Sequence, residues 1–150
     1  MKFEKPKYSK SKADKAGEIL ANKGLTLEQK NEAIEVLFNW RASHNYPLQI
    51  LRNKLRRESL KIDPNSITVK RLKRSVSIIR KLSDSKKEGQ GNIKLSRMQD
   101  IGGCRSVLST VSQCELLLDV FLKSKLRHKR IKVDNYITVP KTDGYRGIHI

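Results

Sequence analysis

The chain has 150 residues, 37% hydrophobic and 32% charged, which fits one globular domain with a core and excludes a disordered tail. Its 33 Lys and Arg against 15 Asp and Glu give a formal net charge of +18. That excess points to polyanionic partners such as nucleotides, RNA, DNA or an acidic membrane surface, without choosing among them.

Zinc-binding and membrane-spanning proteins are both disfavoured by the sequence. Cys104 and Cys114 have neither C-x-x-C spacing nor a nearby histidine pair, so we expect free thiols. The N-terminus has no apolar signal region, and the longest apolar-rich run, residues 116–122, is too short to span a bilayer. We therefore expect a cytoplasmic protein with no membrane partner.

Helical patterns fill the N-terminal part of the chain. A helix over 11–22 is expected to end near Gly24. Thr26 and Gln29 have capping-box spacing at the start of a second helix. A third helix is expected after Pro47, with an apolar stripe made of Leu48, Leu51 and Leu55.

From residue 65 onward the pattern becomes mixed. Strands are predicted over 66–73 and 101–108, and residues 83–92 are predicted to form a flexible surface loop. Two helices are predicted as well, over 75–82, with Val76, Ile79 and Leu82 inward, and over 112–124. Residues 129–133 and 136–139 are predicted to be extended. The sequence thus predicts an α+β fold, with N-terminal helices followed by a mixed β-sheet flanked by helices.

Two cations lie two residues apart in the first predicted strand. Arg71 and Lys73 would point to the same face of the sheet, where their charges repel each other. An anion bound between them would offset this repulsion, and extension of both side chains into solvent would relieve it as well. The pair alone leaves both interpretations open.

Asp100 and Arg105 flank the pair Gly102 and Gly103. Because they are five residues apart, they would lie on opposite faces of a regular strand. One site can contain both only if the glycines provide a bulge, a twist or a close approach of ligand to backbone. The alternative is an Asp at the strand entry and an Arg at the sheet edge.

The C-terminal stretch places Lys141, Tyr145, Arg146 and His149 around a Pro-Lys-Thr-Asp-Gly turn. An aromatic ring followed by basic groups suits a nucleobase and its phosphates, because stacking of a base is worth roughly 1–3 kcal/mol. A surface turn with Tyr145 packed inward is the alternative.

Three segments, RLKRSVSIIRKL, SRMQDIGGCRSVL and DNYITVPKTDGYRGIHI, resemble in order and spacing the motifs of the RelA/SpoT family of alarmone synthetases. Those motifs run R-x-K-x-x-x-S-I-x-x-K, D-I-x-G-x-R and D-Y-I-x-x-P-K-x-x-G-Y-R-x-x-H. The preceding NWRASHNYPLQILRNKLRR resembles the helical lead-in of a subgroup. The resemblance implies a nucleotidyltransferase-like synthetase fold, with a helical region at 1–64 and an incomplete synthetase domain, lacking its C-terminal strands, at 65–150.

The resemblance also implies an activity. Enzymes of this family transfer the β,γ-pyrophosphate of ATP to the 3′-hydroxyl of GDP or GTP and make (p)ppGpp. Some toxin relatives instead modify the 3′ end of tRNA.

Site residues carry over at the matching positions. Arg71 and Arg105 would sandwich the adenine of ATP, and Lys73 would contact its phosphates. Asp100, the catalytic residue, would hold Mg²⁺. The acceptor nucleotide would be bound by three residues of the third motif: Lys141, Tyr145 and His149.

Two departures from the family pattern bear on activity. Asp134 stands where the family usually has a Lys, which removes an expected phosphate contact. The second catalytic carboxylate, a Glu in a later E-x-Q-x-R-T-like motif, has no counterpart before Ile150, so we expect a truncated chain. Asp134 or Asp143 would then have to supply the second metal ligand, and synthesis would be at least about 10²-fold slower than in a complete domain.

Three hypotheses follow. The first is a pyrophosphokinase acting on GDP or GTP. The second is a toxin-type enzyme acting on tRNA or other RNA, favoured by the charge of +18 and the basic runs RNKLRRESLK and KSKLRHKRIK. The third is a nucleotide- or RNA-binding remnant without catalysis, favoured by the missing carboxylate. The acceptor and the formation of a homo-oligomer are not decided by the sequence.

Overall fold

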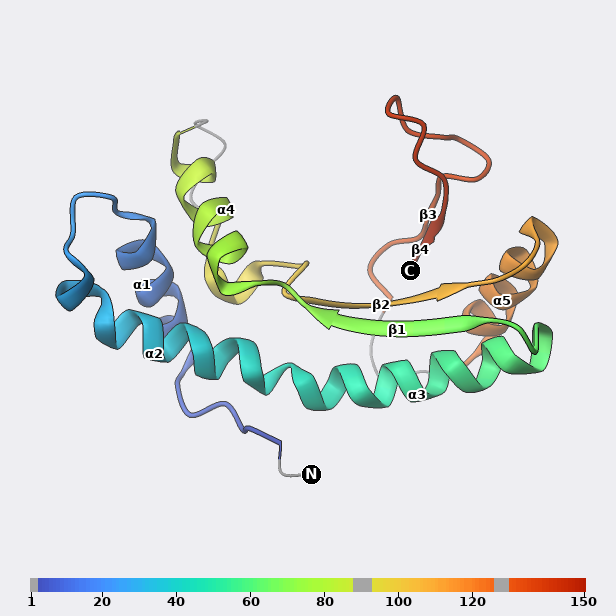
Figure 1. Ribbon diagram of the computed structural model, residues 1–150, viewed down its shortest axis with the longest axis horizontal. Coiled ribbons are helices and arrows are strands. Elements are labelled where there is room, and N and C mark those ends of the chain that lie inside the picture. The colour runs from blue at the N-terminus through green and yellow to red at the C-terminus, as the bar shows by residue number, and fades with distance from the viewer. Residues whose placement is uncertain (1–2, 88–92, 126–129) are drawn as a thin grey trace. The chain divides into compact units, whose positions relative to one another are not determined.

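The structure is a computed structural model that describes residues 3–87, 93–125 and 130–150. These residues form five α-helices, one short 3-10 helix and four strands, which confirms the α+β class. In chain order the elements are α1 (Lys10–Ala21), α2 (Leu27–Ser43), α3 (Asn45–Ile62), β1 (Ile67–Leu72), α4 (Ser75–Lys87), η1 (Leu95–Arg97), β2 (Gly102–Val107), α5 (Val111–Lys123), β3 (Asp134–Asn135) and β4 (Ile148–His149) (Figure 1).

The chain divides into two compact units. Unit 1 comprises Met1–Arg52 and Val69–Arg105, and unit 2 comprises Asn53–Thr68 and Ser106–Ile150. The predicted boundary at residue 64 separates a helical region from the family domain, not one compact unit from the other, and it stays a prediction.

The second helix begins where its predicted cap places it. The N–H of Thr26 donates to the side chain of Gln29 at 2.8 Å, and the N–H of Gln29 donates to the Thr26 hydroxyl at 3.3 Å, which completes the predicted capping box. The third helix, in contrast, begins at Asn45 rather than after Pro47. Proline is tolerated in the first turn of a helix, so Pro47 does not mark the start of α3.

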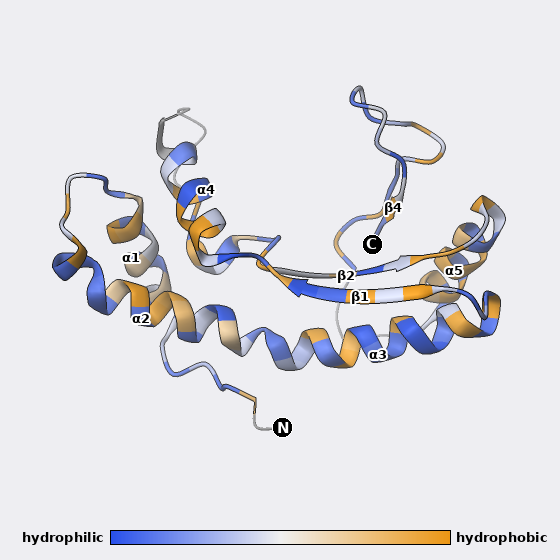
Figure 2. Ribbon diagram, viewed as in Figure 1, coloured by the Kyte–Doolittle hydropathy of each residue, from blue (hydrophilic) through white to orange (hydrophobic). Residues whose placement is uncertain are grey.

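Unit 1 is built around α1, α2, α4 and η1. A Cβ placed on Gly17 of α1 would lie 3.0 Å from the Cβ of Leu95, so the glycine permits close approach of η1. Figure 2 shows apolar residues recurring between hydrophilic ones along these helices, as expected for amphipathic elements. The buried cluster consists of Ala13, Ala16, Leu20, Ala33, Val36, Leu37, Trp40, Ile78, Leu82, Leu95, Met98 and Ile101.

Two predicted apolar faces are corrected by the structure. Val76 was expected inward but is 77% exposed, whereas Ile78 is fully buried. Ile78 and Leu82 are four residues apart and share a helix face, and Val76 points away from it. On α3, Leu48 is buried but Leu51 is 43% exposed, so the predicted stripe is narrower than expected.

β1 and β2 pair as a two-stranded sheet. The N–H of Lys73 donates to the carbonyl of Ile101 at 2.7 Å, and the hydroxyl of Thr68 lies 3.0 Å from that of Ser106, so the strands run antiparallel. Exposure alternates along both strands. The predicted sheet is therefore present, although the described residues form this pair and a second antiparallel pair, β3–β4, rather than one mixed sheet.

The two adjacent glycines of β2 face different surroundings. A Cβ on Gly102 would lie 2.4 Å from Cδ1 of the buried Leu48, so Gly102 lets α3 pack closely on this face. A Cβ on Gly103 would meet no described residue within 4 Å. Gly103 therefore belongs to the opposite face, here named the uncovered face because no described residue lies over Gly103, and this face also carries exposed Arg71 and Arg105.

Unit 2 depends on polar contacts as well as on apolar burial. The carboxylate of Asp63 accepts hydrogen bonds from the N–H and the hydroxyl of Ser109, each at 2.8 Å, and from the N–H of Asn65 at 2.9 Å. These bonds tie the end of α3 to the start of α5 and lower the pKa of Asp63. Leu117 and Phe121 are the buried residues of α5.

Two predictions for irregular segments are wrong in part. Residues 136–139 form a turn rather than extended chain, because the side chain of Asn135 accepts hydrogen bonds from the N–H groups of Ile137 and Thr138. α4 continues to Lys87 through the first part of the predicted loop, and residues 88–92 lie outside the described part of the chain. No helix in the described part of the chain is long and apolar enough to cross a membrane.

Substitution by alanine should affect the stability of the protein differently at the two glycines. Gly102→Ala should lower the free energy of unfolding by about 1–3 kcal/mol, because the new methyl group has no room beside Leu48. Gly103→Ala should change it by no more than about 0.5 kcal/mol. Urea denaturation of the two variants measures both values, and equal stabilities would contradict the assignment of the two faces.

Candidate active site

Asp100 lies at the centre of a small charged cluster in unit 1. Its Oδ2 accepts a bond from Nζ of Lys73 at 2.9 Å, and its Oδ1 accepts one from Nζ of Lys81 at 3.0 Å. Lys73 follows β1, Lys81 lies on α4, and Asp100 precedes β2. Three elements that meet in this unit are thus joined through one carboxylate.

The electrostatic environment favours the charged form of Asp100. Partial burial of the carboxylate raises its pKa, but the hydrogen bonds and charges of Lys73 and Lys81 outweigh this effect, so the pKa is lower than usual. The side chain is 45% exposed, while that of Lys73 is only 19% exposed. The carboxylate is accordingly ionised at neutral pH and remains accessible to a ligand.

Asp100 lies in a turn before β2, not within the strand. It can therefore approach Lys73 while Arg105 projects from the strand itself, and the two residues need no bulge between them. Ile101 is buried directly after Asp100 and fixes the chain at this point.

Arg71 and Arg105 are both exposed and project from the uncovered face of β1–β2. Neither has a hydrogen-bond or ion-pair partner among the residues that the structure places. Gly103 adds no side chain to this face, which also carries the exposed Val69 and Val107. Two unneutralised guanidinium groups on an open sheet surface form a suitable platform for a planar, anionic ligand.

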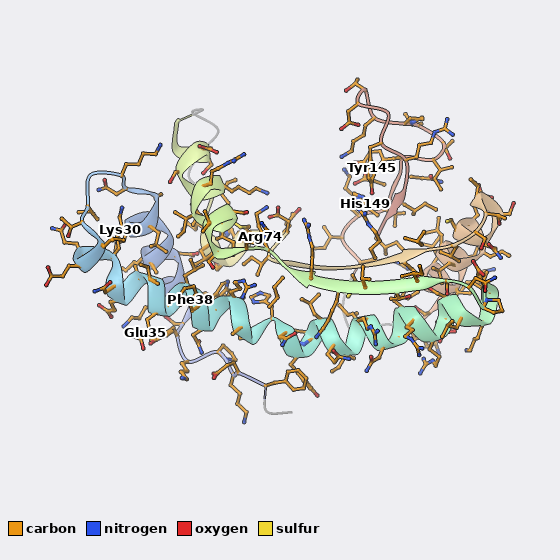
Figure 3. The ribbon with its side chains drawn as sticks, in the orientation of Figure 1. Lys30, Glu35, Phe38, Arg74, Tyr145 and His149 are labelled. Atoms are coloured by element: carbon orange, nitrogen blue, oxygen red, sulfur yellow. The ribbon has the colours of Figure 1, made fainter. Side chains whose placement is uncertain are left out.

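The aromatic and basic residues of the third motif gather in unit 2. The hydroxyl of Tyr145 lies 2.9 Å from Nε2 of His149, and their ring centroids are 5.5 Å apart. The ammonium of Lys141 lies 4.5 Å from the ring centroid of Tyr136 and 5.4 Å from that of Tyr145. Figure 3 shows Tyr145 and His149 next to each other.

The turn that holds this cluster has a defined backbone. Gly144 has a positive φ of 80°, which glycine adopts without strain, and its N–H donates to the carbonyl of Lys141. The side chain of Asp143 accepts a bond from the N–H of Tyr145. Tyr145 is half-buried against its aromatic neighbours, as the surface-turn alternative expects, and its stacking on a base stays a prediction.

The two aspartates considered as additional metal ligands have local partners. Asp134 pairs with Lys132 at 2.8 Å, and Asp143 stabilises its own turn. Asp134 also lies directly opposite His149 in the β3–β4 register. Across the described ranges, no group of three or more His, Cys, Asp or Glu side chains could hold a metal ion.

The six residues with predicted roles in ligand binding, and Asp100 with its predicted catalytic role, thus fall into two groups. Unit 1 contains Arg71, Lys73, Asp100 and Arg105, and the last motif in unit 2 contains Lys141, Tyr145 and His149.

Residues 70–150 match the family model described as "Region found in RelA / SpoT proteins", which is more than half of the chain. The chain belongs to the RelA/SpoT family. The comparison with curated proteins finds no match.

Two residues of this RelA/SpoT chain join the clusters although the sequence analysis gave them no role. Lys81 is the last residue of the first motif, and its position in that motif was the available signal. Tyr136 contributes a ring 5.2 Å from that of His149 and 6.0 Å from that of Tyr145. Its signal was weaker, because an aromatic at the start of a predicted strand commonly packs in a core.

The lowering of the Asp100 pKa by Lys73 and Lys81 can be tested by removing one lysine. Lys81→Gln should raise the pKa of Asp100 toward the ordinary aspartate value of about 3.9, because one of two charged donors is lost. In the wild type, the lowered pKa means that the pair stabilises the fold fully above that ordinary value and loses this effect as the pH falls through the folded-state pKa. Carboxyl ¹³C NMR titration measures the shift.

A suitable control is Lys15→Gln, which removes the same charge from the exposed side of α1. It should leave the Asp100 titration unchanged. An equal shift in both variants would attribute the effect to net charge rather than to the contact.

Proposed function

We propose that this RelA/SpoT chain is a pyrophosphokinase that transfers the β,γ-pyrophosphate of ATP to the 3′-hydroxyl of GDP or GTP. In this reaction the 3′-oxygen forms a new bond to the β-phosphorus, and the bond between the β-phosphorus and the oxygen that bridges it to the α-phosphorus breaks. AMP leaves with that bridging oxygen, and the proton of the 3′-hydroxyl is released to solvent. The observation that carries the proposal is the Lys73–Asp100–Lys81 cluster beside the two arginines of the β1–β2 face.

The donor site has the charge distribution that such a transfer requires. Phosphoryl-type transfer depends on positioning and on neutralisation of phosphate charge. Lys73 and Lys81 would exchange their contacts with Asp100 for contacts with ATP phosphates. Arg71 and Arg105, which have no protein partner in the described residues, would stack on the adenine, a contact worth about 0.5–2 kcal/mol for each guanidinium.

The fit of Mg²⁺ can be judged from the donor set. Mg²⁺ usually takes one or two carboxylates, and water and substrate phosphates complete its octahedral shell. Asp100 supplies one accessible carboxylate, and the release of its lysines to ATP would free both of its oxygens. A bound Mg²⁺ would neutralise phosphate charge and polarise the transferred group.

The residues that would bind the acceptor nucleotide are those of the third motif. Tyr145 would stack on the base, and its bond to His149 would hold the ring in one orientation. Lys141, which lies over two aromatic rings and has no carboxylate partner in the placed part of the chain, would turn to the acceptor phosphates. Together with the donor group, these residues supply both halves of a two-nucleotide reaction.

Activity can be tested directly. The purified protein with ATP, Mg²⁺ and GDP or GTP should yield ppGpp or pppGpp on anion-exchange chromatography. Asp100→Asn should lower the rate at least about 10²-fold, because the carboxylate that would hold the metal is lost. Binding of ATP without any product would favour the non-catalytic remnant, and absence of ATP binding would contradict the proposed site.

The two groups can be separated by affinity. Arg71→Ala should weaken ATP binding by about 2- to 30-fold and leave GDP binding unchanged. Tyr145→Ala should weaken GDP binding by about 5- to 150-fold, while Tyr145→Phe, which keeps the ring, should retain most of the affinity. Calorimetry with each nucleotide measures both, and a loss of both affinities in either variant would contradict two separate groups.

A second candidate acceptor is the 3′ end of tRNA, favoured by the net charge and by the exposed Arg56 and Arg57 on α3. Each tRNA phosphate neutralised on binding should contribute about −0.7 to −0.9 to the slope of log affinity against log salt. Binding that does not depend on salt would remove this candidate. Transfer of labelled pyrophosphate from ATP to tRNA, in the absence of transfer to GDP or GTP, would establish it instead.

A further inference from the structure

Arg41 connects the helical lead-in to the proposed donor site. Its Nε donates a hydrogen bond to the backbone carbonyl of Lys73 at 2.7 Å, although the two residues are 32 positions apart in the chain. The contact is partly buried and both residues belong to unit 1. A hydrogen bond from a guanidinium to a carbonyl is charge-assisted and stronger than a bond between neutral groups.

Lys73 is held at three points. Its N–H donates to the carbonyl of Ile101, its carbonyl accepts from Arg41, and its Nζ donates to Asp100. The backbone of Lys73 is thus fixed on both sides of its Cα. This fixation directs the side chain toward Asp100 at the junction between β1 and α4.

Asn45 makes a parallel contact one helical turn after Arg41. Its Oδ1 accepts a bond from Nζ of Lys70 at 2.8 Å. Arg41 is in the last turn of α2 and Asn45 begins α3, so the junction between these two helices supports β1 at two positions.

Hydrogen bonds and a ring contact hold the junction itself. The carbonyl of Trp40 lies 2.8 Å from the Ser43 hydroxyl, which donates to it, and 2.7 Å from Nδ1 of His44. The rings of Trp40 and His44 are in edge contact at 5.4 Å, and Trp40 is buried in the core cluster. Arg41 therefore projects from a turn that these contacts restrain, and its hydrogen bond restrains the backbone of Lys73 in turn.

We propose that Arg41 is a positioning residue for ATP binding, which acts through the backbone of Lys73 without touching the nucleotide. The inference rests on the proposed function for the role of Lys73 and assigns a purpose to the helical lead-in, which lies outside the matched residues 70–150. Loss of Arg41 leaves the carbonyl of Lys73 without its charged donor and lets the end of β1 move relative to Asp100.

The first test measures affinity. Arg41→Gln should weaken ATP binding about tenfold and leave GDP binding within twofold of the wild type. The matched control is Lys30→Gln, which removes a charge from the opposite end of the same helix (Figure 3) and from a side chain with no partner in the described residues. It should change neither affinity. Equal losses of ATP and GDP affinity in Arg41→Gln would show a general structural role and overturn the proposal.

The second test is a double-mutant cycle. In a Lys73→Met background, Arg41→Gln should change ATP affinity less than twofold, because Arg41 acts through Lys73. Full additivity of the two substitutions would contradict the proposal.

A third measurement separates failure of this inference from failure of the proposed function. The backbone ¹³C resonance of the Lys73 carbonyl should shift upfield in Arg41→Gln, and the Lys73 Nζ contact with Asp100 should weaken, with no nucleotide present. If the wild type does not bind ATP, the proposed function fails, whereas these resonances still decide whether Arg41 positions Lys73. Unchanged resonances would overturn the inference whatever the nucleotide does.

Discussion

The ion pairs of Asp100 with Lys73 and Lys81 are the constraint on which the proposed donor site depends. Each lysine occupies a different oxygen of one carboxylate, so the end of β1, α4 and the turn before β2 are fixed relative to one another. The cluster is partly exposed, and its contribution to stability is modest because solvent screens such pairs. The cluster contributes mainly by positioning, because it holds side by side two cations that would otherwise repel each other.

The β1–β2 sheet positions the two arginines of the proposed donor site. Antiparallel pairing places Arg71 and Arg105 on the face that α3 does not cover, and Gly103 adds no side chain to that face. On the other face, Gly102 admits Leu48, so one glycine serves packing and its neighbour serves access. The Gly-Gly sequence thus reflects the two faces of a single strand and not a bulge.

Local patterns were sufficient for most elements, whereas the residues of the two clusters were named by the resemblance to the family motifs. The capping box at Thr26 and the alternation of β1 are encoded by neighbours in the sequence, and both were predicted. The exposure of Val76 was missed because the buried face of a helix is chosen by packing partners distant in the chain. The early start of α3 was missed because proline is tolerated in the first turn of a helix. The contact of Arg41 with Lys73 could not be predicted for the same reason, since nothing in the local pattern relates two residues 32 positions apart.

The charge of the chain is concentrated where the proposed donor lies. Residues 69–105 contain eleven Lys and Arg against three Asp and Glu, and of these acids Asp84 faces Arg80 at 3.7 Å while Asp100 holds two lysines. The remaining arginines of β1 and β2 have no counter-charge in the described part of the chain, and their mutual repulsion opposes the compact state. A bound polyphosphate would remove that repulsion and replace the role of Asp100 toward its lysines. The site therefore carries an excess of positive charge, which a ligand with several negative charges would balance.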